Sequence, residues 1–189
     1  MGDEIDQIDL KLWLDSELLQ KQNLLKASFL ELFEDLGNSF PNDLLREFFP
    51  DSKGKKISKG SNLLGAPYLV LDLIRNFDLD TGANLRVINW FGQGMFICAF
   101  FGKNIRLPAA HFLHDGFAFG LTEQPWELPE QVLQHKSTRN VTEQLLSEAQ
   151  YQLWIKKLEL EGSKKVIFSY INQEIKKILE LKPTPQDKS

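Results

Sequence analysis

The sequence holds little of what disulfide-bonded, metal-cluster and membrane proteins are built from. One cysteine among 189 residues excludes an internal disulfide, and it excludes every zinc or iron–sulfur site that needs several cysteines. The longest stretch without a charged residue, residues 87–102, has 16 residues and includes three glycines. A membrane-spanning helix needs about 20 mostly apolar residues, so we expect this stretch to be buried in a protein core.

The net charge of −4 is distributed unevenly along the chain. Residues 1–52 hold 12 acidic and 4 basic residues, residues 53–66 hold four lysines and no acid, and residues 136–189 hold 10 basic and 7 acidic residues. A mildly acidic chain argues against nucleic acid as a partner, because phosphate-backbone binding needs a net basic surface. The complementary ends can pack on each other within one chain or between two copies.

The motifs of targeting and of common cofactors are missing as well. The N-terminus is acidic and lacks the basic-then-apolar order of a secretion signal. No phosphate-binding loop, dinucleotide fingerprint or G-x-S-x-G elbow occurs in the sequence. We therefore predict a cytoplasmic protein with no membrane partner, and nothing in the sequence indicates a cofactor.

The first helical pattern covers the N-terminal segment. Residues 3–36 contain no proline or glycine, and leucines recur every seven residues at Leu18, Leu25 and Leu32. This period predicts a helical arm over residues 3–36. Because such a length is unusual for one globular helix, we expect the arm either to break near residues 20–22 or to project from the domain.

The middle of the chain, residues 63–125, has the composition of β-strands. Apolar runs predict strands over residues 68–74, 84–91 and 95–101, with a short return strand over 105–107. The lysine-rich segment before them, residues 51–60, is predicted to be a solvated connector. The alternative for this segment is a weak contact with an anionic partner.

The C-terminal part, residues 138–181, again shows a helical period. One helix is predicted from Asn140 to Gly162, and a second from about Ser163. The tail, residues 183–189, is predicted to be disordered. Helices, then strands, then helices indicate an α+β fold. We expect one domain over residues 1–182, with a small antiparallel sheet flanked by the N-terminal and C-terminal helices.

The best candidate for chemistry is the cluster of His111, His114 and Asp115. On a helix these side chains stand at i, i+3 and i+4, so all three reach one metal ion. The alternative is a β-hairpin that turns at Asp115 and Gly116. In a strand, His111 and His114 lie on opposite faces and the metal cluster disappears. The sequence favours the hairpin, in which these are turn and edge residues.

Aromatic residues and arginines are concentrated in the same middle region. Nine of the 21 aromatic residues lie within residues 90–126, and we expect them to form a core beneath the helices. The arginines are expected to pair with acids such as Asp72. The alternative is an aromatic pocket in which arginines hold a carboxylate or phosphate. The residues of that alternative are Arg75, Arg86, Arg106, Trp90, Phe117 and Trp126.

The remaining nucleophile is Cys98, which lies among apolar neighbours. A reactive cysteine needs an electropositive, partly exposed setting, so Cys98 is predicted to be a buried structural thiol. Because no catalytic constellation is complete, we expect a non-catalytic intracellular protein that acts by self-association, as a homodimer, or by binding a protein partner. The alternative is a small-ligand-binding protein or metal-dependent enzyme that uses the aromatic pocket and the histidine cluster.

Overall fold

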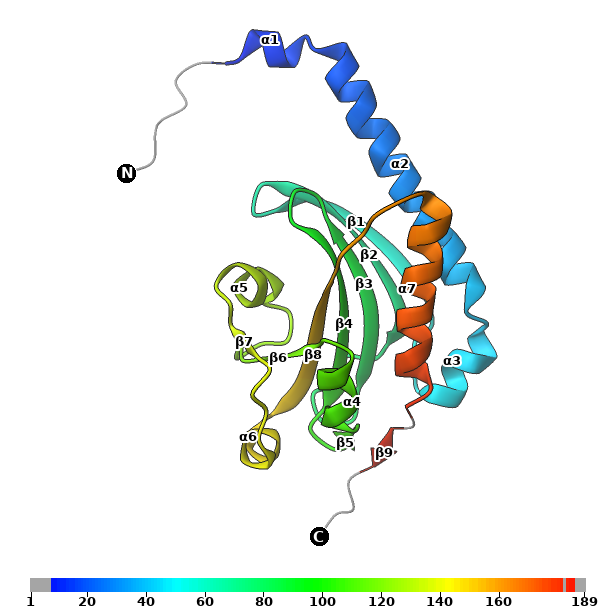
Figure 1. Cartoon of the computed structure of the whole chain (residues 1–189), viewed down its shortest axis with the longest axis vertical. Helices are drawn as coiled ribbons and strands as arrows, with labels where there is room; N and C mark the ends of the chain where they lie inside the picture. Colours follow the sequence, from blue (N-terminus) through cyan, green and yellow to red (C-terminus); the bar gives the residue numbers. More distant parts are fainter. Residues whose placement is uncertain (1–7, 182, 186–189) are drawn as a thin grey trace.

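The apolar runs of the middle region form the strands of one antiparallel sheet. The computed structural model describes residues 8–181 and 183–185, and its sheet has seven strands in the order β1-β2-β3-β4-β8-β6-β7. The sheet is strongly curved (Figure 1). Its strands are β1 Lys56–Leu63, β2 Ala66–Arg75, β3 Ala83–Trp90, β4 Gly94–Gly102, β6 Ala118–Gly120, β7 Ser137–Thr138 and β8 Tyr151–Leu158.

Helices flank this sheet on both sides within the described part of the chain. In Figure 1, α2, α3 and α7 lie against one face, and α5 lies on the other side of the sheet. This arrangement confirms the α+β fold with N-terminal and C-terminal helices around an antiparallel sheet. The helices are α1 Leu10–Trp13, α2 Ser16–Ser39, α3 Asn42–Phe48, α4 Ala109–His114, α5 Leu128–Leu133, α6 Glu143–Glu148 and α7 Lys164–Leu179.

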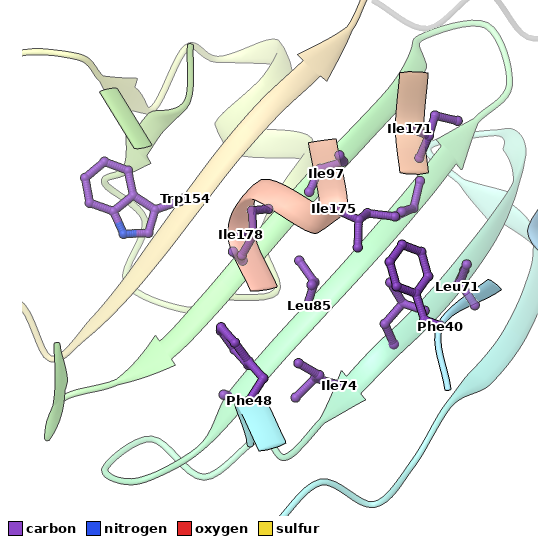
Figure 2. Packing of buried hydrophobic residues seen from close by; sticks show 14 of the residues in the cluster. Phe40, Phe48, Leu71, Ile74, Leu85, Ile97, Trp154, Ile171, Ile175 and Ile178 are labelled. Carbon is purple, nitrogen blue, oxygen red and sulfur yellow. The ribbon is translucent and has the colours of Figure 1, made fainter. Parts of the chain in front are cut away.

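The larger core lies between the sheet and the helices α2, α3 and α7. Figure 2 shows Ile171, Ile175 and Ile178 of α7 lying over the strands that carry Leu85 and Ile97. The spacing of these isoleucines places all three on one face of α7, and each is buried. Burial of one such side chain contributes about 1.5–3 kcal/mol relative to leaving it exposed. The C-terminal helix is therefore fixed to the sheet by its apolar face.

The opposite face of the sheet is also buried and carries a second apolar cluster. Val70, Ile88, Phe96 and Leu153 come from four neighbouring strands, and Leu128 of α5 joins them. Because both faces are covered, the central strands are apolar at almost every position. That is why continuous apolar runs in the sequence predict them correctly.

Strand β8 corrects the predicted helix over residues 140–162. The helix there is only α6, capped by Thr142 rather than by Asn140, and the chain then forms a central strand between β4 and β6. Both faces of this strand are buried, so its sequence lacks the alternation of a half-exposed strand. Lys156 and Lys157 also interrupt the apolar run of this strand, so the sequence pattern does not indicate a buried strand. Backbone hydrogen bonds to β4 hold residues 151–158 in the extended conformation.

The lysine segment also differs from the predictions. Strand β1 occupies the second half of the predicted connector over residues 51–60 and pairs with β2. Its lysines suit an edge strand, where charge discourages pairing with other chains. The predicted return strand at 105–107 is β5, Ile105–Arg106, which pairs with β9, Thr184–Pro185, outside the main sheet. Residues 186–189 lie outside the described residues, and disorder of the tail over residues 183–189 remains a prediction.

The N-terminal arm breaks earlier than predicted and it projects from the domain (Figure 1). Two helices replace one because two aspartates act as N-caps. The Oδ1 of Asp9 accepts a hydrogen bond from the amide of Leu12, and the Oδ1 of Asp15 accepts one from the amide of Leu18, each at 2.9 Å. The break therefore lies between Trp13 and Ser16. Predicted arm residues 3–7 lie outside the described residues.

No helix in residues 8–181 and 183–185 is long and apolar enough to span a membrane.

Candidate functional site: an apolar arm and a lysine-rimmed groove

One apolar face runs along the whole of α2, and only its C-terminal half is covered. Leu32 and Leu36 on this face are buried against the core. The same face continues toward the N-terminus as Leu25 and Leu18, because residues seven apart lie on one side of a helix. Within the described residues of α2, none N-terminal to Leu32 is buried. The face that packs on the sheet thus extends beyond the sheet.

We call the uncovered segment, residues 8–25, the arm. Leu18 on the arm is half-buried. Eight other large apolar side chains of the arm are 46–82% exposed, and they are Ile8, Leu10, Leu12, Trp13, Leu14, Leu19, Leu24 and Leu25. Scattered exposed apolar residues are normal on a protein surface, but a contiguous group of this size is typical of an interaction surface. The arm is the largest such group along the described chain.

A groove of about 460 Å³ lies at the base of the arm, between α2 and the β1–β2 edge of the sheet. Its floor and walls are mostly apolar, and lysines from α2 and β1 stand at its rim. Gly60 keeps the groove open on the strand side, because a Cβ there would lie 2.4 Å from the Tyr68 ring. The residues that form the groove include Lys26, Leu30, Lys59, Tyr68, Leu69 and Phe91.

The net charges of the arm and of the groove have opposite signs. The arm holds three acids (Asp9, Asp15 and Glu17) and two lysines (Lys11 and Lys21), while two lysines, Lys26 and Lys59, line the groove. Glu17 has an exposed partner in its own helix at 2.5 Å, and such a pair contributes less than about 1 kcal/mol. A basic group of another chain can therefore replace Lys21 as the partner of Glu17 at little cost.

The predicted ligand residues come together in only one place. Arg86 lies beside Trp126, with 5.6 Å between the guanidinium carbon and the ring centroid, and 5.4 Å from the Phe77 ring. The Nε of Arg86 donates to the Oδ1 of Asp72 at 2.9 Å, which confirms the expected pairing with an acid. The cavity beside them holds about 20 Å³, room for about one water. Ligand binding by Arg86 and Trp126 remains a prediction.

The other four predicted ligand residues lie apart and have protein partners. Arg75 donates to the carbonyl of Lys53, and Arg106 donates to the carbonyl of Leu146. The indole of Trp90 donates to a backbone carbonyl, and Phe117 packs edge-on against another core ring. These residues therefore do not converge on one pocket.

The histidine segment is helical, so the favoured hairpin is wrong. Pro108 begins α4 and Gly116, at φ +86°, follows its end. Phe112 is the one buried residue of α4, and its ring stacks on Trp154 at 4.8 Å with an interplanar angle of 9°. A short helix buries the Phe112 ring and leaves the polar residues beside it exposed to solvent. This burial explains why the segment forms a helix rather than a hairpin.

Helical geometry brings only part of the predicted metal cluster together. The Nδ1 of His114 lies 3.3 Å from the Oδ1 of Asp115, and 89% of the histidine side chain is exposed. His111 is also exposed. Among residues 8–181 and 183–185, no three histidine, cysteine, aspartate or glutamate side chains are placed to hold a metal ion. The metal site at His111, His114 and Asp115 remains a prediction.

Cys98 is a buried thiol, as the sequence predicts. It lies in β4 within the second apolar cluster and is 4% exposed. Burial raises its pKa to about 12, because the thiolate loses its solvation there. The nearby Arg86 opposes this shift only in part. At neutral pH the group is therefore a protonated thiol, which is a poor nucleophile.

Comparisons of the chain with protein-family models, with curated proteins and with solved structures returned no match. What the protein does is therefore inferred from its own residues. The leucine period indicates the arm, but no sequence pattern indicates the groove. The groove walls come from α2, from β1 and β2, and from the residue after β3, so no local pattern contains them. Lys26 and Lys59 are 33 positions apart in the sequence, and only the folded chain places both of them at this groove.

Proposed function

We propose that this chain acts by association rather than by catalysis, and that its partner is a second copy of itself. In this homodimer the two arms pack antiparallel about a two-fold axis that crosses residues 18–25. The N-terminal end of each arm, with α1, then lies at the groove of the other copy. The observation that carries the proposal is the apolar face of α2, which continues uncovered past the end of its own sheet.

The exposed side chains of the arm are of the kind that a stable dimer interface needs. A typical specific interface buries about 800 Å² on each partner, with an apolar centre that contains aromatic residues. The arm offers eight large apolar side chains that are about half exposed or more, including Trp13. A two-fold interface uses this surface twice, since the same patch serves both copies.

Antiparallel pairing also satisfies the leucine period. Because Leu18 and Leu25 share a face, a two-fold axis between them brings Leu18 of one copy close to Leu25 of the partner subunit. Rows of side chains that repeat every seven residues pack together in helix pairs in this way. The same axis carries Leu14 of each copy to the level of Phe29 of the partner subunit, beside the groove.

Charge complementarity favours a second copy over an unrelated protein. In the antiparallel pair, the N-terminal part of one arm, with the acids Asp9, Asp15 and Glu17 against the single base Lys11, approaches the groove of the other copy, whose rim carries Lys26 and Lys59. Opposite charges at an interface rim fix register and speed encounter more than they add affinity. We place this dimer in the cytoplasm, in agreement with the free and buried state of Cys98.

Sedimentation velocity over a concentration series tests the proposal. Wild-type protein should pass from monomer to dimer between about 1 and about 100 µM. The double variant Leu18→Gln/Leu25→Gln should weaken the dimer at least about 100-fold, because each substitution occurs twice in a two-fold interface. Neither side chain is buried in the monomer, so the circular dichroism spectrum should stay unchanged.

The matched control removes an exposed leucine elsewhere. Leu133→Gln on α5 alters a side chain of 43% exposure that lies outside the arm, and dimerisation should survive it. A wild-type protein that stays monomeric at the highest concentration contradicts the proposal. So does a double variant that dimerises as well as the Leu133→Gln control.

A further inference from the structure

A second hollow lies at the opposite end of α2 from the arm. It has a volume of about 340 Å³ and lies between α3, the loop at residues 52–55 and β2. The lining residues include three cations and no acid, in a protein whose net charge is −4. They are Arg46, Lys53 and Lys55, with the polar Asn42 and Ser52 beside them.

One of the three cations is held in place by the protein itself. The Nζ of Lys55 donates to the carbonyl of Gly37 at 2.7 Å and to the carbonyl of Phe40 at 2.9 Å. These carbonyls belong to the end of α2, where the helix leaves acceptors without intrahelical partners. Lys55 thus stabilises the helix end and keeps its third N–H available in the hollow.

The other two cations are exposed and unpaired. Among the described residues, the side chains of Arg46 and Lys53 make no hydrogen bond or ion pair. The nearby acids Asp43, Glu47 and Asp51 do not line the hollow. An anion that enters therefore meets two free cations and a third, fixed one, without displacing an existing partner.

The loop around Ser52 adds further donors and positive charge. The Oγ of Ser52 accepts hydrogen bonds from the amides of Gly54, at 3.2 Å, and Arg75, at 3.1 Å. The hydroxyl proton of Ser52 has no acceptor among the described hydrogen bonds and is left to donate. Arg75 also donates to the carbonyl of Lys53, so its guanidinium lies against the same loop.

We propose that this hollow, between α3 and the loop at residues 52–55, binds the phosphate group of a small phosphorylated molecule. A guanidinium, two ammonium groups, a hydroxyl and an amide offer the mixed donors that a phosphate dianion accepts. The buried Leu45 and Leu73 supply an apolar wall for the carbon part of the ligand. The site is independent of the proposed dimer, because the arm lies at the other end of α2.

Titration with inorganic phosphate, followed by ¹H–¹⁵N correlation spectra at about pH 8, tests this site, since phosphate is mostly a dianion there. Sodium chloride should hold the ionic strength constant. The amides of Ser52, Gly54 and Lys55 should shift and saturate. Arg46→Gln and Lys53→Gln should each weaken binding about threefold, and the double variant about tenfold, as expected for exposed charge pairs.

Lys103→Gln is the control, because it removes the same charge from an exposed turn away from both the hollow and the groove. Phosphate binding should be unchanged by it. Shifts that rise linearly without saturating, or an equal loss in Lys103→Gln and Lys53→Gln, would overturn the proposal. The same titration with glycerol 3-phosphate distinguishes two kinds of ligand. If glycerol 3-phosphate binds more tightly than inorganic phosphate, the hollow binds an organic phosphate. If both bind equally, the ligand is the free phosphate anion. Lys55 is left unchanged because it also holds the end of α2.

Discussion

Phe29 meets Phe91 edge-to-face, with their ring centroids 5.8 Å apart and their planes at 87°. Phe29 belongs to α2 and Phe91 follows β3, so this contact fastens the helix to the end of the sheet. The arm extends from this point without burying any residue of its own, as far as the described chain shows. The rigid domain therefore ends at an aromatic pair, and the surface proposed for dimerisation begins there.

Truncation of Phe29 should weaken this attachment. Phe29→Ala removes a half-buried ring and its aromatic partner contact, so the free energy of unfolding should fall by about 2 kcal/mol. Denaturant unfolding at a protein concentration below the dimer range measures this. Leu121→Ala, which truncates a half-exposed side chain elsewhere, should change stability by no more than about 0.5 kcal/mol. Equal effects of the two variants would show that Phe29 does not anchor α2.

The ion pair between Lys156 and Glu174 should matter far more for stability than exposed pairs do. Lys156 of β8 donates to Glu174 of α7, and their side chains are 15% and 5% exposed. Lys177 donates to the same carboxylate at 2.7 Å. Glu174→Gln removes the charge that both lysines face, so the free energy of unfolding should fall by about 3 kcal/mol.

The control for this prediction is the same substitution in an exposed pair. Glu17→Gln breaks the surface pair with Lys21 and should cost less than about 1 kcal/mol in monomeric protein. Chemical denaturation of both variants gives the comparison. A Glu174→Gln variant as stable as Glu17→Gln would mean that the pair joining β8 to α7 contributes nothing net.

Cys98 should make stability fall at high pH. Its folded pKa of about 12 lies above the ordinary value of 9.0, so between these values the unfolded chain loses the proton while the folded chain keeps it. The contribution of the protonated Cys98 thiol to the free energy of unfolding is fully present below about pH 9. It is lost as the pH rises toward about 12, by up to about 1.4 kcal/mol per pH unit.

Cys98→Ala isolates this effect from the lysines and tyrosines that titrate in the same range. The difference in unfolding free energy between wild type and Cys98→Ala should be constant up to about pH 9 and then shift against the wild type. A difference that stays constant across the whole range would contradict a buried, neutral thiol in β4.

The charge of the groove rim should tune dimer affinity. Lys59→Glu places an acid opposite the acidic end of the partner's arm, and it does so at both grooves. Dimer affinity should therefore fall about tenfold, as measured by sedimentation velocity. Lys103→Glu, an exposed lysine in the turn between β4 and β5, makes the same charge change away from the arm and should leave affinity unaltered. Equal losses in both variants would indicate a net-charge effect only.

The parts of the fold that can be predicted from sequence are those where one local pattern dominates. Strand β4 is a continuous apolar run, and β2 and β3 are mostly apolar, because both faces of these strands are buried. Helix α7 carries its isoleucines at a helical period. Strand β8 escapes prediction because its lysines interrupt the apolar run, and only its pairing with β4 makes it extended. Strand β1 escapes prediction because an edge strand rich in lysine has the composition of a loop.

The candidate sites, too, can be predicted only where a local sequence pattern indicates them. The leucine period predicts the arm, and the tendency of buried arginines to pair with acids predicts the contact of Arg86 with Asp72. The helix at His111 is hard to predict because Asp115 and Gly116 suit a hairpin turn equally well, and the stacking of Phe112 on Trp154 is a long-range contact. The groove is not predicted because residues distant in sequence line it. The second hollow is lined mainly by residues 42–55, and the alternative of a weak anionic contact at the lysine-rich segment 51–60 is the sequence signal that points toward it.

Cysteine cross-linking across the arm tests the central claim most directly. In a Cys98→Ala background, Gln22→Cys lies on the same face as Leu18 and Leu25, near the proposed two-fold axis. Mild oxidation should link it to the cysteine of a second copy, giving a covalent dimer on a non-reducing gel. Gln20→Cys, on the opposite face of α2, is the matched control and should remain monomeric. No more dimer from Gln22→Cys than from Gln20→Cys would contradict antiparallel pairing of the arms.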